Sequence, residues 1–142
     1  MNEGNRRLVE QIFERAKFVS SLGIGLVSCG EGWCETKLAA LPAHLQQHGF
    51  VHAGVVMTLA DHTCGGAAAS TVADGKDVIT VENKTSFLRP APGPDLICRA
   101  QVLRSGKNLI FVEAEVSSRR NGEPILVAKM SSTLAVIALK SS

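Results

Sequence analysis

The sequence predicts an α+β fold in which an antiparallel sheet wraps around one long central helix. Residues 51–71 are apolar, contain no proline and show no charged stripe, so they form a helix that other elements must cover. Segments rich in Val, Ile and Thr follow it, and Asn121-Gly122 is a strong hairpin signal between the last two. This segregation of helix and strands is typical of α+β folds with antiparallel sheets.

An amphipathic helix is expected before the sheet. Apolar side chains recur at helical spacing over residues 5–19, with Arg and Glu between them. We expect this helix to pack over a sheet edge or a partner subunit. A DNA-reading helix is the alternative, but the sequence lacks the second helix of a helix-turn-helix.

Six strands complete the expected sheet. Glycine-containing turns separate the strands of each hairpin, Pro42 ends the second strand, and the prolines in 89–94 make that connection rigid. The expected strands are 22–29, 33–41, 77–88, 96–105, 109–119 and 124–139.

The composition restricts the class of protein. The chain has 142 residues, of which 45% are hydrophobic, so we expect 1–142 to form a single domain with its own core. A net charge of +2 does not by itself indicate nucleic acid binding. No segment resembles a transmembrane span or a signal peptide, so we expect a cytoplasmic protein with neither a membrane nor a nucleic acid partner. The four cysteines contain no C-x-x-C pair, so we expect reduced, mostly buried thiols and no metal site.

A single carboxylate, Asp61, lies in the middle of the apolar helix. On a helical wheel it falls with Gly54, Gly65 and Ala68, the small-residue side that a backbone or a ligand could approach. No Lys or Arg occurs between positions 37 and 76 to pair with it. Because burying an unpaired carboxylate is costly, Asp61 is either hydrogen-bonded by another part of the fold or retained for a reaction.

The start of the same helix is a second candidate for chemistry. Its first N–H groups lack helical partners and carry partial positive charge, which suits a developing oxyanion. Asp61 lies about 12 Å further along the axis from Ala53, at 1.5 Å per residue. One chain does not easily bring both groups to one reacting atom. We therefore expect a two-fold dimer with antiparallel neighbouring helices, in which Asp61 of one subunit serves the helix start of the other.

Two motifs resemble those of a known family. The hotdog-fold acyl-CoA thioesterases of the phenylacetate-degradation (PaaI-like) type have the signature N-x-x-G-x-x-H-G-G…L-x-D. Here the corresponding residues are Gln46-x-x-Gly49-x-x-His52-Ala53-Gly54 and Leu59-Ala60-Asp61. The run NKTSFLRPAPG, residues 83–93, resembles the strand and turn that follow in that family. The resemblance spans about 22–139.

This resemblance implies a hotdog fold, a homodimer with the active site at its interface, and a dimer of dimers. It also implies hydrolysis of an acyl-CoA thioester to free acid and CoA. The sequence departs from the signature at Gln46, where the family has Asn, and at Ala53, where it has Gly. Gln keeps the carboxamide donor with a longer reach, and the Ala53 methyl group would narrow the site for a different acyl group.

The resemblance also implies roles for the matching residues. The thioester carbonyl oxygen would accept hydrogen bonds from the backbone N–H of Ala53, with Gly54 as a further donor, and from the Gln46 carboxamide. Asp61 of the partner would activate water as a general base or attack the carbonyl directly. The sequence does not distinguish these two routes.

Two further residues have a functional interpretation from the resemblance and an ordinary structural one. Thr80 would hold the attacking water, and its alternative is an ordinary strand threonine. His52 would orient or polarise the substrate at the helix start, and its alternative is a capping or packed neutral histidine.

Coenzyme A, as part of the substrate, requires cations at the mouth of a groove, and no separate cofactor is expected. Solvated surface charge is the alternative for each cation taken singly. The candidates are Lys84, Arg89, Arg104 and Lys107.

Two other functions remain compatible with the sequence. One is a related hotdog enzyme that acts on an acyl-CoA double bond or on an acyl-carrier-protein thioester. The other is a non-catalytic acyl-CoA binder or sensor, which needs the groove but not the acid. Replacement of Asp61 by Asn would separate hydrolysis from binding.

Overall fold

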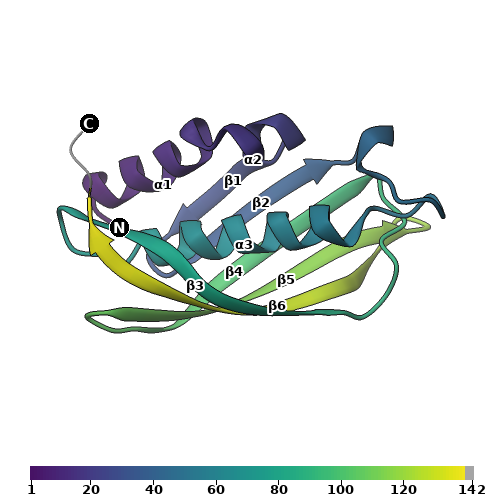
Figure 1. Ribbon diagram of the computed structural model, residues 1–142. Helices are drawn as coiled ribbons and strands as arrows, with labels where there is room; N and C mark the ends of the chain where they lie inside the picture. Colours follow the sequence, from purple (N-terminus) through teal and green to yellow (C-terminus); the bar gives the residue numbers. More distant parts are fainter. Residues whose placement is uncertain (140–142) are drawn as a thin grey trace.

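The chain folds around a central helix that lies on the concave side of a single sheet (Figure 1). The computed structural model describes residues 1–139. The central helix is α3 (Ala53–Ala69), and six antiparallel strands follow the order β1-β2-β4-β5-β6-β3. The predicted fold class is confirmed. The strands are β1 (Gly25–Gly30), β2 (Trp33–Ala39), β3 (Lys76–Phe87), β4 (Asp95–Ser105), β5 (Leu109–Arg120) and β6 (Glu123–Ala138).

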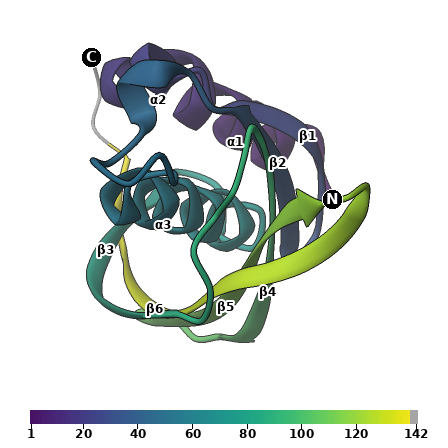
Figure 2. The same ribbon diagram turned by 90° about the vertical axis from the view of Figure 1, so that its right-hand side faces the viewer.

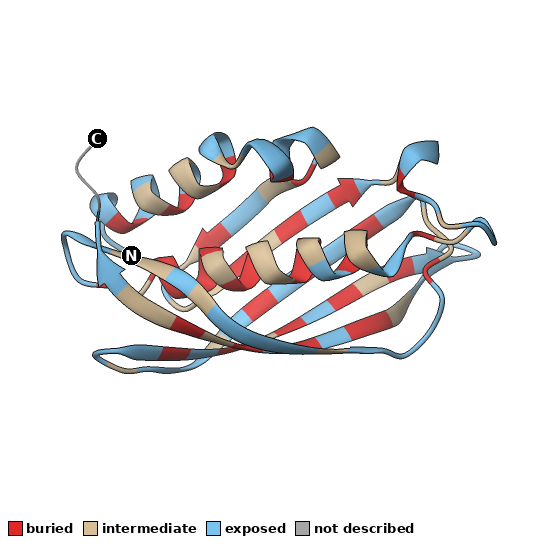
Figure 3. Ribbon diagram, in the orientation of Figure 1, coloured by how far each residue is buried: buried red, intermediate tan, exposed pale blue. Residues whose placement is uncertain are grey.

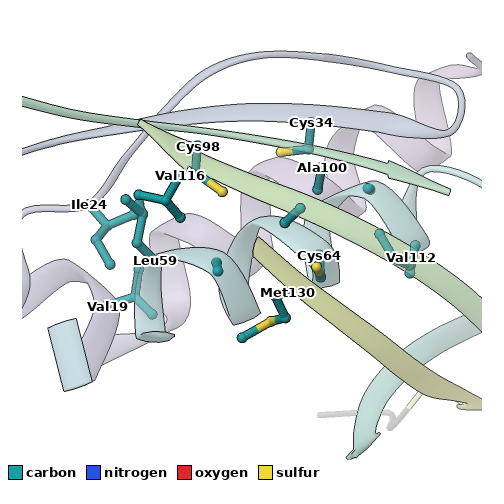
Figure 4. Packing of buried hydrophobic residues seen from close by; sticks show 14 of the residues in the cluster. Val19, Ile24, Cys34, Leu59, Cys64, Cys98, Ala100, Val112, Val116 and Met130 are labelled. Atoms are coloured by element: carbon teal, nitrogen blue, oxygen red, sulfur yellow. The ribbon is translucent and has the colours of Figure 1, made fainter. Parts of the chain in front are cut away.

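Small side chains allow α3 to lie close to the sheet (Figure 4). On its sheet-facing side Leu59, Ala60, Cys64 and Ala67 are completely buried. They contribute to one hydrophobic core with strand residues such as Cys98, Ala100, Val116 and Met130. Burial of this apolar surface, rather than helix propensity, accounts for most of the stability of such a helix.

The central helix is shorter than the predicted 51–71. Val51 forms a bridge with Leu45, and His52 is the N-cap, so the helix begins only at Ala53. At the other end Ser70 is the C-cap, and its N–H donates to Gly66 O at 3.2 Å. Ala68, two turns from Asp61 on the same face of α3, is completely buried, so this part of the predicted small-residue side is covered rather than open to a ligand.

The predicted helix 5–19 is two helices, α1 (Glu3–Arg15) and α2 (Lys17–Leu22). The break falls at Ala16, whose backbone is extended. Nothing in the sequence marks this break, because alanine is a good helix former. Since α2 continues to Leu22, β1 begins at Gly25 rather than at residue 22. Helix α1 packs on α3 and on the edge strand β1, so the predicted packing over a sheet edge is confirmed (Figure 2).

The remaining elements follow the predicted strands closely. Asn121 and Gly122 adopt φ angles of 51° and 82° in the predicted β5–β6 hairpin. Strand β2 ends at Ala39, before the short 3-10 helix η1 (Pro42–His44), rather than at residue 41. No helix within residues 1–139 is long and apolar enough to cross a membrane.

Within the described residues, strand β3 forms one edge of the sheet and pairs with β6 alone. Two apolar side chains on this edge are largely exposed, Ile79 at 56% and Val81 at 60%. Figure 3 shows much of strand β3 in the colour of exposed residues. An exposed apolar edge strand is a template for pairing with another chain.

Candidate active site

The loop before α3 is folded by the Gln46 side chain. Its Oε1 accepts hydrogen bonds from the backbone N–H groups of His48, at 2.6 Å, and Phe50, at 3.2 Å. Gly49 has a φ of 85°, which a side chain would disfavour. These bonds orient the carboxamide, because its oxygen must face the two N–H groups. Its NH₂ group has no partner within residues 1–139 and is free to donate.

His52 caps the start of α3. Its Nδ1 accepts the backbone N–H of Gly54 at 2.8 Å, which leaves Nε2 as the protonated nitrogen of the neutral ring. The capping role, one of the two alternatives, is therefore what the structure shows for this side chain. The Gly54 N–H is already used by this bond, so Gly54 is not available as an oxyanion donor in this conformation.

The backbone N–H of Ala53 remains without a partner among the described residues. Ala53 lines a cavity of about 580 Å³ together with Gln46, His52 and Arg89. Arg89 is held at this cavity by a hydrogen bond from Nη1 to Leu126 O at 2.8 Å. The helix start, the carboxamide and one cation therefore share one cavity.

Asp61 is half-buried and receives two hydrogen bonds from β3. Thr80 Oγ1 donates to Asp61 Oδ1 at 3.0 Å, and Asn83 Nδ2 donates to the same oxygen at 3.4 Å. Oδ2 receives no hydrogen bond from residues 1–139, and no Lys or Arg in this range forms a salt bridge with Asp61. The carboxylate is thus oriented through one oxygen and free at the other.

A β-bulge explains how both β3 side chains reach Asp61. Thr80 and Asn83 are three residues apart, so a regular strand would point them to opposite faces. The pairing of β3 with β6 shifts between Thr80 and Glu82, which inserts an extra residue at Val81. Such a bulge reverses the alternation beyond it.

Asp61 and Thr80 line a second cavity of about 590 Å³, bounded by α1, α3, β3 and β6. No residue is common to this cavity and the one at the helix start. Within one chain the acid and the helix start are therefore separate, as the axial distance of about 12 Å predicts.

The predicted cations are not brought together in one chain. Arg89 lines the cavity at the start of α3, and Lys84 lines a different cavity of about 270 Å³ with β4, β5 and β6 residues. Arg104 and Lys107 lie at the opposite end of α3, where Ser105 Oγ donates to Thr71 Oγ1 at 2.9 Å.

The four thiols are free and buried. Burial raises the pKa of Cys98 to about 12 and also raises the pKa of Cys34 and Cys64. Protonated thiols of this kind are poor nucleophiles. Within residues 1–139 no three His, Cys, Asp or Glu side chains cluster as metal ligands would.

Similarity to known proteins identifies the family of this chain. The family model described as the thioesterase superfamily matches residues 48–125, more than half of the chain. The chain belongs to the thioesterase superfamily. The match contains the segment His52 to Asp61 and the later run 83–93, so the resemblance seen in the sequence is confirmed.

Individual relatives of this superfamily member can be aligned with it over most of its length. A solved structure of a thioesterase family protein from Silicibacter pomeroyi is 36% identical, with a TM-score of 0.92 over 95% of this chain and 99% of that chain. The human acyl-coenzyme A thioesterase 13 is 27% identical over 88% of this chain and 90% of its own. The PaaI protein of the E. coli phenylacetic acid degradation operon has a TM-score of 0.85 at 22% identity, covering 96% and 97% of the two chains. The superfamily member therefore has the hotdog fold.

Two features of this thioesterase-family protein were not predicted from its sequence. One is Asn83 as a second donor to Asp61, which depends on the bulge. The other is His62, whose Nε2 lies 3.1 Å from Ile12 O and whose ring packs edge-on against Phe13. The positions of Ile12 and Phe13 in an amphipathic helix indicated that α1 packs on something, but not on which histidine.

Proposed function

We propose that the protein hydrolyses acyl-CoA thioesters to free acid and CoA, in a dimer where each active site combines two chains. One observation carries the proposal. Asp61 presents an unpartnered carboxylate oxygen in a cavity between α3, helix α1 and the edge strand β3. A donor-lined cavity at the start of the same helix complements it.

The dimer we propose pairs the β3 edges and places the two α3 helices side by side and antiparallel. Exposed Ile79 and Val81 on β3 support this pairing, since burying them stabilises the dimer. Contact of Asp61 with the partner's Ala53 requires the two-fold axis to pass near the midpoint, residue 57. Met57 lies there and is 41% exposed. In the dimer of dimers that we also propose, two such units associate.

This axis gives a direct test of the assembly. In the Met57→Cys variant the two new thiols would face each other across the axis, so mild oxidation should yield a disulfide-linked dimer on a non-reducing gel. Glu14→Cys, on the exposed side of α1, is the control that should remain monomeric on the gel. Absence of the Met57→Cys dimer together with a monomer in light scattering would contradict the shared site.

The chemistry follows from these groups. The carbonyl oxygen of the thioester accepts hydrogen bonds from the Ala53 N–H and the Gln46 NH₂, and the positive end of the helix stabilises the oxyanion. In the general-base route, Asp61 takes a proton from a water molecule while the water oxygen bonds to the carbonyl carbon of the thioester. The C–S bond then breaks, and the thiolate of CoA receives that proton. Thr80 holds Asp61 in place and retains lone pairs that accept a hydrogen bond from the water.

The alternative route begins with direct attack of Asp61 on the carbonyl and gives an anhydride, which water then hydrolyses. Single-turnover hydrolysis in heavy-oxygen water separates the two routes. In the general-base route the label appears only in the product acid. Hydrolysis of the anhydride at the Asp61 carbonyl instead leaves the label on Asp61 and gives an unlabelled acid in the first turnover.

The phosphates of CoA are proposed to lie along cations contributed by both chains. Arg89 lies in the cavity at the helix start. In the antiparallel dimer the partner's Arg104 and Lys107 extend beyond that end, at a distance that the long pantetheine arm spans. Lys84 is the fourth candidate, on the outer side of β3.

The Asp61→Asn variant tests the proposed function. We expect hydrolysis, followed by free-thiol release, to fall by at least about 100-fold, while the fold, the oligomer and CoA binding are retained. Asp95→Asn, on the exposed start of β4, is the matched control. Unchanged turnover in Asp61→Asn would remove the catalytic role, and binding without hydrolysis by the unmodified protein would favour an acyl-CoA sensor.

A further inference from the structure

The cavity that contains Asp61 continues away from it as a groove beneath α1. Its walls come from four elements and are mainly aliphatic, with no Phe, Tyr or Trp among the described lining residues. Arg15 and Asp77 also line the groove. Along one wall, β3 runs from Thr80 to Asp77, about 10 Å at 3.3 Å per residue. The apolar wall residues include Leu8, Ile12, Val78, Leu134 and Ile137.

A second, smaller cavity adjoins the groove at the end away from Asp61. A neighbouring cavity of about 250 Å³ shares Leu8, Gln11 and Leu139 with it and leads on to Lys76. Figure 1 shows α1 beginning at the same end of the molecule as the end of β6. The two cavities therefore lie one after the other beside α1, from the level of Asp61 toward the start of that helix.

Helix α1 is fixed over this groove at two points. Asn5, a buried side chain, donates from Nδ2 to Ala69 O at 3.0 Å and to Val72 O at 2.8 Å, at the end of α3. Directly after Asp61 in the chain, the His62 ring bonds to Ile12 O. Because both ends of α1 are attached, the roof of the groove is an ordered element rather than a loose terminal segment.

We infer that this groove holds the acyl chain of the substrate, and that the preferred substrates carry a straight aliphatic chain of medium length. The inference rests on the proposed hydrolysis at Asp61. A thioester carbon placed at Asp61 has its acyl substituent directed into the groove, because the CoA side leaves through the partner's cavity at the helix start. An elongated space with Leu, Ile and Val walls suits a flexible methylene chain. A compact aromatic ring would leave most of its length empty.

Two positions along the groove act at different distances from Asp61. Gly65 lies one helical turn from the acid, and a Cβ built there meets no atom within 4 Å, so a side chain would project into free space. Leu8 lies further along, where the groove joins the neighbouring cavity. A side chain added at Gly65 should therefore exclude shorter chains than one added at Leu8.

The test compares kcat/KM for butyryl-, octanoyl-, dodecanoyl- and phenylacetyl-CoA. We expect the natural protein to prefer octanoyl-CoA over butyryl- and phenylacetyl-CoA. Gly65→Met should lower the octanoyl-to-butyryl ratio by at least about tenfold, and Leu8→Trp should lower mainly the dodecanoyl-to-octanoyl ratio. Glu14→Trp places the same ring on the exposed side of α1 and should leave both ratios unchanged. Thermal unfolding and light scattering verify fold and assembly.

A binding measurement keeps the inference separate from the proposed function. Titration with a non-hydrolysable octanoyl-CoA thioether should show tighter binding than CoA alone, and Gly65→Met should abolish that gain. If thioester hydrolysis is absent but this pattern holds, the proposed function fails and the groove assignment stands. If hydrolysis occurs but neither variant changes the chain-length ratios or the thioether affinity, the groove does not hold the acyl chain.

Discussion

The two sides of α3 differ although they belong to one helix of uniformly apolar sequence. The sheet-facing side is completely buried at Leu59, Ala60 and Cys64, whereas Met57 and Asp61 on the other side are only partly covered. Packing against the sheet requires small or apolar residues on the first side. It does not require an acidic residue on the second. The open side is therefore the part of the helix that is free to carry chemistry.

The largest effect is expected at Gln46, in the loop that precedes α3. The Gln46→Glu variant keeps the oxygen that accepts the His48 and Phe50 N–H groups but loses the NH₂ donor. We expect kcat to fall by at least about 100-fold with little change in the free energy of unfolding. Gln46→Leu should lose the loop bonds as well, and so lower both quantities. Equal activity of Gln46→Glu and the natural protein would exclude the carboxamide as an oxyanion donor.

Two adjacent glycines compare the sides directly. A Cβ at Gly66 would lie 2.8 Å from Cys34 Sγ and 3.2 Å from the Phe13 ring, whereas one at Gly65 meets nothing within 4 Å. We expect Gly66→Ala to lower the free energy of unfolding by about 1–3 kcal/mol. Gly65→Ala should raise it by up to about 1 kcal/mol, because alanine favours the helix. Urea unfolding of both variants measures the contrast, and equal effects would mean that Gly66 does not pack against Cys34 and Phe13.

The same contrast explains what the sequence could predict. Apolar periodicity and the Asn121-Gly122 turn are local signals, so the sheet and the central helix followed from them. The isolated Asp61 stood out for a local reason too. The bulge at Val81 and the break at Ala16 depend on how distant segments fit together, and neither residue type signals them. Asn83 and the roof formed by α1 were missed for this reason, and the separation of the predicted cations required coordinates.

A smaller effect is expected at the donors that hold Asp61. Thr80 donates at 3.0 Å, whereas the more exposed Asn83 donates at 3.4 Å. Thr80→Val should therefore lower kcat more than Asn83→Leu, which should lower it only several-fold, as expected for a weak exposed hydrogen bond. Unchanged kcat in Asn83→Leu would make Asn83 a surface residue only.

The smallest effect concerns the attachment of α1 to the open side through His62. Burial lowers the pKa of His62, opposed by its bond to Ile12 O and by the nearby charge of Asp61. Below the ordinary histidine pKa of about 6.5, the unfolded chain takes up a proton that the folded chain does not. His62 therefore lowers stability progressively as the pH falls below about 6.5, until the lowered pKa is reached.

His62→Gln keeps a donor for Ile12 O but does not titrate. The difference in free energy of unfolding between the natural protein and this variant should be constant above neutral pH and should shift against the natural protein below it. Parallel curves in a urea series across this range would show that the ring is accessible to water, and that α1 does not close the groove beside Asp61.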